Sequence, residues 1–358
     1  MHYIPFNSRK TYHKAPFGAA RAGSETVFRV IFPRSLAVTG AALEVRGPDG
    51  LSESAPMAWE AMQGDSEEWW RVAYTPQAEG LYYYSFTFTS KTGAAGITQS
   101  GAGLGMLSPE GSDWQLTVCS ADFRTPDWLK GSIMYQIFPD RFARGGAVRG
   151  EVPGDRFVRG DWSGEPLWDP DEKGRVSRAD YFGGNLDGIV RRLGRLEELG
   201  VGCIYLNPVF EAHSSHRYDT ADYGKIDPLL GDGEDFERLC AEAEKRGISV
   251  ILDGVFSHTG DDSVYFNKYG RYPAKGAYQS QASPYYEWYR FDRWPDNYKC
   301  WWNVDILPEV AEENPAFMAF VNGPDGIAAS WLRKGARGWR LDVADPADDR
   351  ARAAVGIV

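Results

Sequence analysis

The stretch DFERLCAEAEKRGISVILDGVFSH, residues 235–258, predicts a helix that leads directly into a buried strand. Residues 235–247 carry apolar side chains at helical spacing and end in Gly247, a common helix stop. Residues 248–256 are a short apolar run, which we interpret as a buried strand. A helix that alternates with a buried strand is the repeating unit of a parallel α/β sheet.

The same alternation continues on both sides of this stretch. The further predicted elements are strands at 133–138, 203–210 and 336–343, a helix at 186–200, a mostly helical segment at 315–335 that is interrupted near Gly323 and Pro324, and an aromatic, polar insert at 259–312. Strands that alternate with helices form right-handed βαβ units. We therefore expect four parallel strands, with the insert after the third.

Residues 1–125 have a different pattern, which predicts an all-β domain. Short runs rich in β-branched and aromatic residues recur between turn signals, at 25–32, 41–47, 69–74, 81–88 and 114–118. Five or more such strands indicate a β-sandwich. The Gly- and Ala-rich stretch at 93–105 is expected to be a loop. The expected domains are thus a β-sandwich at 1–125 and an α/β domain at 126–358.

Composition narrows the class of protein. The net charge of −11, without basic tracts, argues against a nucleic-acid partner. No run of residues approaches a membrane span and no signal peptide is visible, so we expect a cytoplasmic protein without a membrane partner. The four cysteines are far apart and show no metal-binding spacing. Aromatic residues make up 14% of the chain, which fits either a large core or rings that stack on sugars.

Polar residues gather where the predicted parallel strands end. Asp253 ends the third strand and His258 follows it, while Arg340 and Asp342 lie one alternation apart on the fourth strand and share a face. His216 and Tyr218 come after the second strand. Taken singly, each residue could cap a helix, close a turn or lie on the surface. Together they indicate a site, because active sites of βα barrels lie at these strand ends and burial of unpaired charge is costly.

Four stretches make the chain resemble the α-amylase family, glycoside hydrolase family 13, and within it the cyclomaltodextrinase, neopullulanase and maltogenic amylase branch. They are MYQIFPDRF at 134–142, YFGGNLDGI at 181–189 with GVGCIYLNPVFEAHSSHRYDTADYGKIDP at 200–228, GISVILDGVFSH at 247–258, and GWRLDVAD at 338–345. The resemblance implies an N-terminal β-sandwich followed by a (β/α)8 TIM barrel. It also implies retaining hydrolysis of α-1,4 bonds, with α-1,6 bonds as a second linkage, in cyclodextrins, maltooligosaccharides or pullulan.

The resemblance assigns roles to individual residues. Asp342 matches the catalytic nucleophile, and Arg340 the cation that orients it and stabilises its charged form. Asp253 and His258 match the pair that binds the sugar beside the nucleophile. His216 and Tyr218 match residues that contact the same sugar, Tyr218 by stacking. A retaining mechanism also needs a second carboxylic acid. The family places it on a fifth strand, and the sequence ends just past the fourth.

This sequence departs from the family pattern in several places, and three expectations follow from these differences. The barrel should be incomplete, with about four strands, and the chain should lack the acid and be inactive. An interrupted reading frame would explain both the change of composition after Asp345 and the early end, whereas a deliberate truncation or a degenerate paralogue would explain only the length. No cofactor is expected: calcium occurs in the family, but residues 143–150 carry Arg144 and Arg149 instead of carboxylates, and Ser257 replaces an Asn. The alternatives to an enzyme are a non-catalytic glucan-binding protein, which uses Trp294, Trp301 and Trp302, or an assembly role as a homodimer through the N-terminal domain.

Overall fold

The computed structural model describes residues 3–146, 156–169, 172 and 180–343. Part of the arginine-containing loop at 143–150, with Arg149, and the tail from residue 344 lie outside the described residues. The chain forms two compact units, Met1–Arg124 and Thr125–Val358, and each is described by itself.

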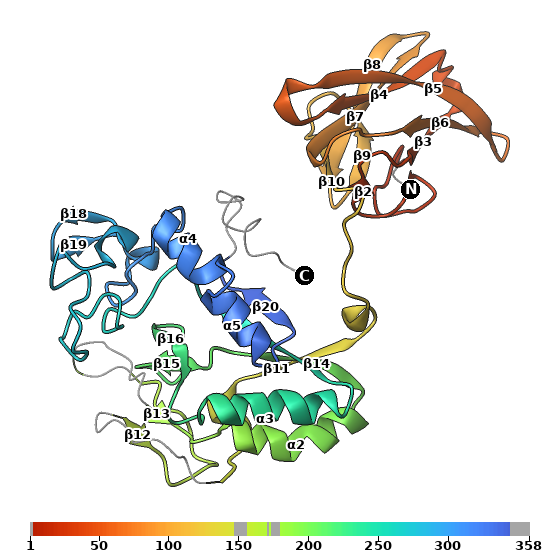
Figure 1. Ribbon diagram of the computed structural model, residues 1–358. Helices are drawn as coiled ribbons and strands as arrows, with labels where there is room; N and C mark the ends of the chain where they lie inside the picture. Colours follow the sequence, from red (N-terminus) through yellow and green to blue (C-terminus); the bar gives the residue numbers. More distant parts are fainter. Residues whose placement is uncertain (1–2, 147–155, 170–171, 173–179, 344–358) are drawn as a thin grey trace. The chain divides into compact units, whose positions relative to one another are not determined.

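The first unit is a curled, mostly antiparallel sheet, drawn in red to orange in Figure 1. Its main path runs β1-β3-β6-β5-β4-β7-β10-β2, and β8 and β9 continue from β7. The strands are β1 Lys14–Ala15, β2 Ala20–Arg21, β3 Thr26–Pro33, β4 Gly40–Arg46, β5 Ser52–Gln63, β6 Glu67–Tyr74, β7 Gly80–Ser90, β8 Gly93–Gly101, β9 Leu104–Leu107 and β10 Trp114–Cys119.

Strand β5 makes the curl possible, because its two halves pair with different neighbours. Residues 52–57 pair with β4, and residues 58–63 pair with β6 across a bulge between Trp59 and Ala61. Side chains of β3 and β6 therefore share one core with those of β4, β7 and β10; Phe28, Trp70 and Tyr84 are among its buried members. Alternating burial along β7 shows the period of two that the sequence predicts for a strand with one buried face.

The expectation of a loop at 93–105 is wrong. Residues 93–101 form β8, which pairs antiparallel with β7, and β9 pairs in turn with β8. Gly and Ala have low β propensity, but pairing with an existing strand outweighs that preference.

The second unit is built on a four-stranded parallel sheet in the order β11-β14-β17-β20. The strands are β11 Ile133–Ile137, β14 Val201–Leu206, β17 Ser249–Gly254 and β20 Gly338–Leu341. The helices are α1 Pro139–Phe142, α2 Leu186–Glu198, α3 Gly233–Glu244, α4 Pro315–Asn322 and α5 Ile327–Arg333. Three short pairs complete the unit: β12 Phe157–Val158 with β13 Asp180–Tyr181, β15 Phe210–Ala212 with β16 Thr220–Ile226, and β18 Phe291–Arg293 with β19 Asn297–Tyr298.

The two faces of the parallel sheet differ in chemistry. Helices α2 and α3 lie side by side (Figure 1), and their apolar side chains pack with Ile204, Leu206, Val250 and Leu252 of the sheet. Side chains Asn185 and Asp232 accept hydrogen bonds from the first turns of α2 and α3 and so fix where these helices begin. The opposite face has only a small apolar cluster around Cys203, Tyr205 and Ile251. The strand ends on that face carry the polar side chains of the candidate site, as the side-chain alternation requires.

Across the ranges that the structure describes, every helix is too short or too polar to cross a lipid bilayer.

Candidate active site

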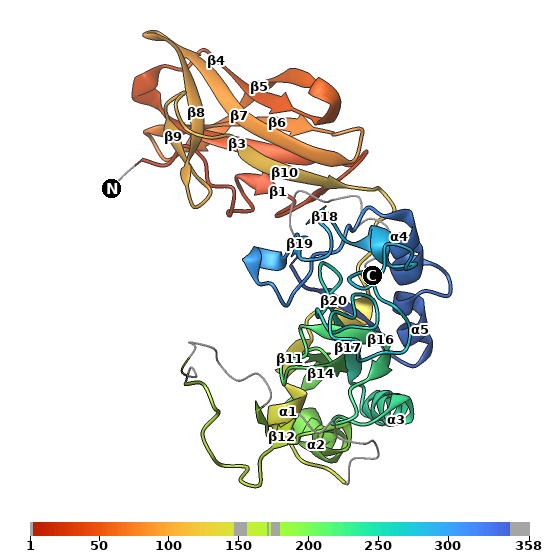
Figure 2. The same cartoon turned by 90° about the vertical axis from the view of Figure 1, so that its left-hand side faces the viewer.

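Arg340 links two carboxylates at the carboxyl ends of β17 and β20, the strands seen side by side in Figure 2. Arg340 lies opposite Asp253 in the register of the two strands. Its Nη1 atom donates to Asp253 Oδ1 at 2.8 Å and to Asp342 Oδ1 at 2.6 Å. The Asp253 side chain is fully buried, whereas that of Asp342 is 15% exposed. One guanidinium therefore holds two carboxylates, and the carboxylate with more solvent access is Asp342.

Asp253 is held from its other side by two tyrosines. The hydroxyls of Tyr205 and Tyr218 both donate to Asp253 Oδ2, at 2.5 and 3.0 Å. Burial raises the pKa of Asp253, and the hydrogen bonds from Tyr205 and Arg340 offset only part of that rise. Burial and the nearby Asp253 carboxylate raise the pKa of Tyr218, so its hydroxyl keeps its proton at neutral pH.

The hydrogen-bonded chain continues across the sheet to its first strand. Asn207 Nδ2 donates to the Tyr218 hydroxyl at 3.1 Å, and Gln136 Nε2 donates to Asn207 Oδ1 at 2.8 Å. A cavity of about 350 Å³ opens here, lined by Gln136, Phe138, Asn207 and His216. The polar chain thus connects the ends of all four strands and borders a space that a ligand could enter.

His216 lies at this cavity beside Tyr218. Its Nδ1 atom accepts a hydrogen bond from the Tyr218 backbone N–H at 3.2 Å. The two rings lie 6.0 Å apart and are inclined by 35°. Both rings therefore come from one short segment, and they can present aromatic surface to the same ligand.

His258 is buried below the site. Burial lowers its pKa, although the Asp342 carboxylate opposes this effect, so the ring is neutral at pH 7. Its Nδ1 atom lies 3.0 Å from the Ser257 hydroxyl, and its ring lies 5.4 Å from that of Trp301. A neutral imidazole has one nitrogen that donates and one that accepts a hydrogen bond, and it adds no charge to the site.

The six residues singled out from the sequence thus meet in one region. Arg340, Asp342, Asp253 and Tyr218 share one hydrogen-bonded network, His216 borders its cavity, and His258 interacts electrostatically with Asp342. Sequence reasoning did not include Tyr205 and Asn207. The strand alternation offered a signal for Tyr205, since it lies two residues after Cys203 on the face that also holds Asp253. Asn207 directly follows the second strand, where site residues are expected.

The described residues do not fit a calcium site of the kind that the resemblance implies. The Arg144 guanidinium donates to the carbonyl oxygens of Phe182, Gly160 and Arg159, at 2.8, 3.3 and 2.6 Å. These oxygens are already bound to a fixed positive charge, which repels a second cation. Among the described residues no group of three or more His, Cys, Asp or Glu side chains could hold a metal ion.

The parallel sheet carries a cation, paired carboxylates and a cavity at the carboxyl ends of its strands. This arrangement defines a class of α/β domains whose ligand site is built from the loops after each strand. Residues 136–353 match the family model described as the alpha amylase catalytic domain. The chain belongs to this family, glycoside hydrolase family 13.

Individual relatives agree with this assignment. The chain is 36% identical to an amylopullulanase of Thermoanaerobacterium saccharolyticum, over 95% of this chain and 29% of that protein. It is 34% identical to neopullulanase 2 of Thermoactinomyces vulgaris, over 76% of this chain and 42% of that protein. A solved cyclomaltodextrinase covers 99% of this chain with a TM-score of 0.61 and 25% identity, and the match spans 58% of that structure. The chain spans less than half the length of these two curated relatives.

Proposed function

We propose that this chain binds an α-glucan at the carboxyl ends of β11, β14, β17 and β20, in a site of the retaining glycosidase type. The observation that carries the proposal is Arg340, whose Nη1 atom bridges the buried Asp253 and the more accessible Asp342. A nucleophilic carboxylate must be charged, oriented and reachable by the sugar. Asp342 meets these requirements better than Asp253, which accepts hydrogen bonds on both of its oxygens.

In this proposal each residue has a defined task. Asp342 is the carboxylate that would attack the anomeric carbon, as the glycosidic C–O bond breaks and the leaving oxygen takes a proton from an acid, and Arg340 orients this carboxylate. Asp253 contributes to sugar binding through Arg340 and the tyrosine hydroxyls that it holds, and His258 hydrogen-bonds a hydroxyl of the sugar at the nucleophile. Tyr218 stacks on that sugar and His216 contacts its edge. The polar chain through Asn207 and Gln136 holds the Tyr218 hydroxyl in place.

Cleavage also requires a carboxylic acid that protonates the leaving oxygen. The other carboxylate of the hydrogen-bonded network, Asp253, is committed to Arg340 and two tyrosines. We therefore propose that residues 1–358 by themselves bind α-glucans but do not hydrolyse them at a useful rate.

We also propose that the parallel sheet forms the first four strands of a (β/α)8 barrel. In the part of the chain that the structure describes, β11 and β20 each pair with a single strand. Strand β11 exposes Ile133, Met134 and Tyr135, at 53%, 46% and 38%. An edge strand presents unpaired backbone N–H and C=O groups and can pair with a further strand. The curled sheet of residues 1–125 is proposed as the β-sandwich domain, with the domain boundary at 125 and 126.

The proposed ligands are α-1,4-linked glucans, with α-1,6 linkages as a second class. Two relatives carry pullulan in their names, and the solved structure is a cyclomaltodextrinase. Cyclodextrins, maltooligosaccharides and pullulan are therefore the ligands to test. Homodimer formation through the first unit and a cytoplasmic location stay predictions.

One observation favours the alternative of a glucan-binding protein without catalysis. Trp302 is 81% exposed and its ring stacks on that of Trp301, at 4.8 Å and 3°. Trp301 in turn lies against His258, so the stacked pair extends from the candidate site towards solvent. A flat, exposed indole is the surface on which a sugar ring stacks.

The deciding experiment measures release of reducing sugar from β-cyclodextrin and maltotriose by the 358-residue chain, with Asp342→Asn as the matched control. We expect no release from either protein, together with saturable binding of β-cyclodextrin by calorimetry. Release that Asp342→Asn abolishes would show that these residues supply an acid, and the proposed inactivity would be wrong. If neither β-cyclodextrin nor maltotriose binds, the proposed glucan site is wrong.

A second comparison distinguishes the glucan-binding alternative, in which the stacked rings of Trp301 and Trp302 bind the sugar. A larger loss of affinity from Trp302→Ala than from Tyr218→Ala would favour that alternative.

A further inference from the structure

His216 and Tyr218 are separated by Arg217, a residue with an unusual backbone. Its φ is +62°, in the left-handed region that few residues other than glycine adopt. Its side chain is fully buried, whereas the neighbouring His216 lines the cavity. A left-handed conformation persists where the surrounding contacts over-determine it. The contacts of Arg217 are therefore informative about how the sugar-contacting pair is held.

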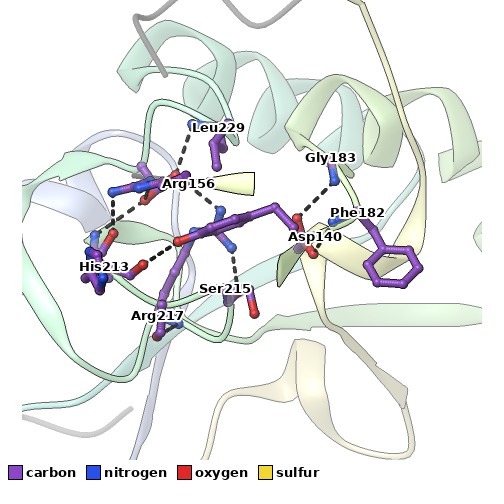
Figure 3. Close-up of polar contacts among 12 residues, drawn as sticks. Asp140, Arg156, Phe182, Gly183, His213, Ser215, Arg217 and Leu229 are labelled. Carbon is purple, nitrogen blue, oxygen red and sulfur yellow. Dashed lines mark hydrogen bonds and ion pairs between the residues drawn. The ribbon is translucent and has the colours of Figure 1, made fainter. Parts of the chain in front are cut away.

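The guanidinium of Arg217 binds backbone and carboxylate at once. Its Nη1 atom donates to the Ser215 carbonyl at 2.8 Å, and its Nη2 atom donates to Asp227 Oδ1 at 3.2 Å. Figure 3 shows Arg217 and Ser215 within this group of contacts. Asp227 is fully buried and also accepts from the Leu229 backbone N–H at 3.0 Å. The anchor of Arg217 is thus itself fixed by the main chain after β16.

Two further side chains of the same cluster hold the rest of this loop. Arg156 Nη1 donates to Asp227 Oδ2 at 2.8 Å, and its Nη2 atom donates to the Ala212 carbonyl at 2.5 Å. The Tyr181 hydroxyl donates to the His213 carbonyl at 2.5 Å. The Tyr181 ring lies 5.5 Å from the guanidinium carbons of both Arg156 and Arg217. Three carbonyl oxygens along residues 212–215 are therefore each bound by one member of this cluster (Figure 3).

We propose that Arg217, anchored by Asp227, is a positioning residue that presents His216 and Tyr218 to the glucan. The inference rests on the proposed function, because it assumes that these two rings contact the sugar. Arg217 does not face the ligand. It sets the direction of the main chain on either side of itself, and the planar guanidinium is suited to this because it bonds the Ser215 carbonyl and the Asp227 carboxylate in one fixed geometry.

The test measures β-cyclodextrin affinity by calorimetry in the 358-residue chain at a temperature where every variant is folded. Arg217→Asn is the first variant, since Asn tolerates a left-handed backbone but lacks the guanidinium. We expect its affinity to fall about tenfold, the size of coupling typical of residues in one contact network. Arg217→Lys keeps the charge and loses the fork, so we expect a smaller loss. This second variant decides the question if Arg217→Asn does not fold.

A double-mutant cycle with Tyr218→Ala separates positioning from general stabilisation. If Arg217 acts through Tyr218, Arg217→Asn should weaken binding less than about twofold in the Tyr218→Ala background. A full, additive loss in that background would overturn the inference, as would an unchanged affinity of Arg217→Asn accompanied by a lower melting temperature. If the unmodified chain does not bind β-cyclodextrin, the proposed function fails first and the inference fails with it.

Discussion

Two of the ion clusters in the second unit have opposite composition. At the candidate site one guanidinium, Arg340, lies between two carboxylates, Asp253 and Asp342. Behind the 212–218 loop one carboxylate, Asp227, lies between two guanidiniums, Arg156 and Arg217. The side chains of the second cluster are at most 5% exposed, whereas Arg340 is 40% and Asp342 15% exposed. The site cluster is therefore partly accessible to solvent, while the cluster around Asp227 is buried and its guanidiniums also bond to main-chain carbonyls.

The largest difference between the clusters should appear in stability. We expect Asp227→Asn to lower the free energy of unfolding by about 3–5 kcal/mol, because it leaves two buried guanidiniums without a counter-charge. The same change in the site cluster, Asp342→Asn, should cost less than about 1 kcal/mol, since its carboxylate is partly solvated. Urea denaturation of the two variants measures both values. Equal costs would mean that burial does not distinguish the two clusters.

Within the described ranges no guanidinium pairs with the buried carboxylate of Asp261, so it shows how burial affects the pKa and the stability. Asp261 accepts a hydrogen bond from the Tyr269 hydroxyl at 2.8 Å and has Lys268 Nζ at 3.7 Å. Burial raises its pKa to about 6. Because the folded chain then holds this proton more tightly than the unfolded chain, the contribution of Asp261 is greatest below about pH 4 and is lost as the pH rises through 6.

Asp261→Asn should remove this dependence. Between pH 4 and pH 7 we expect the unfolding free energy of the unmodified chain to fall by roughly 1–3 kcal/mol relative to the variant. Thermal or urea unfolding at several pH values provides the comparison. Parallel pH profiles for the two proteins would show that the carboxylate ionises as easily in the folded chain as in the unfolded one.

Removal of Arg340, the cation that both carboxylates of the site cluster contact, should weaken ligand binding. Arg340→Gln leaves Asp253 and Asp342 without the charge that both contact, so we expect β-cyclodextrin affinity at pH 7 to fall about tenfold. The loss should be smaller at lower pH, because burial raises the pKa of Asp253 and its protonation relieves the repulsion between the two carboxylates. Arg333→Gln on α5 is the matched control for removal of an arginine. An Arg340→Gln variant with unchanged affinity at pH 7 and at lower pH would contradict the role of Arg340.

An exposed ion pair should contribute least to the free energy of unfolding. Arg195 and Glu198 on α2 lie 2.9 Å apart, but their side chains are 67% and 68% exposed. Arg195→Ala should change the free energy of unfolding by no more than about 0.5 kcal/mol, since solvent and salt screen such pairs. A cost above about 1 kcal/mol in urea denaturation would show that distance outweighs exposure in this protein.

The regular elements of the second unit could be predicted from sequence because their apolar residues follow the periods of helix and strand. The strand after residues 235–247 and the helix at 186–200 appear in the structure as β17 and α2. The strands β5 and β8 were not predicted. Strand β5 contains Pro56 and changes partners halfway, and β8 is rich in glycine, so both depend on neighbours far away in the sequence.

The residues of the candidate site also form two groups, those that a sequence pattern predicts and those that it does not. Asp253, Arg340 and Asp342 could be found because a strand end and a two-residue alternation determine where they lie. Tyr205 has the sequence pattern of a core residue, and Arg217 that of a spacer between two aromatic rings. Strand alternation places Tyr205 on the same face as Asp253, but no local pattern encodes the hydrogen bonds of Tyr205 to Asp253 and of Arg217 to Asp227.

Strand β5 also has a consequence for how the first unit opens. Its residues 52–57 complete the hydrogen bonding of β4, and its residues 58–63 complete that of β6. Detachment of this strand would therefore release backbone amides on both sides of the curl in the same event. Native-state hydrogen exchange should therefore show one group of slowly exchanging amides that spans β4, β5 and β6 and opens cooperatively. Two layers that open independently would instead show two such groups.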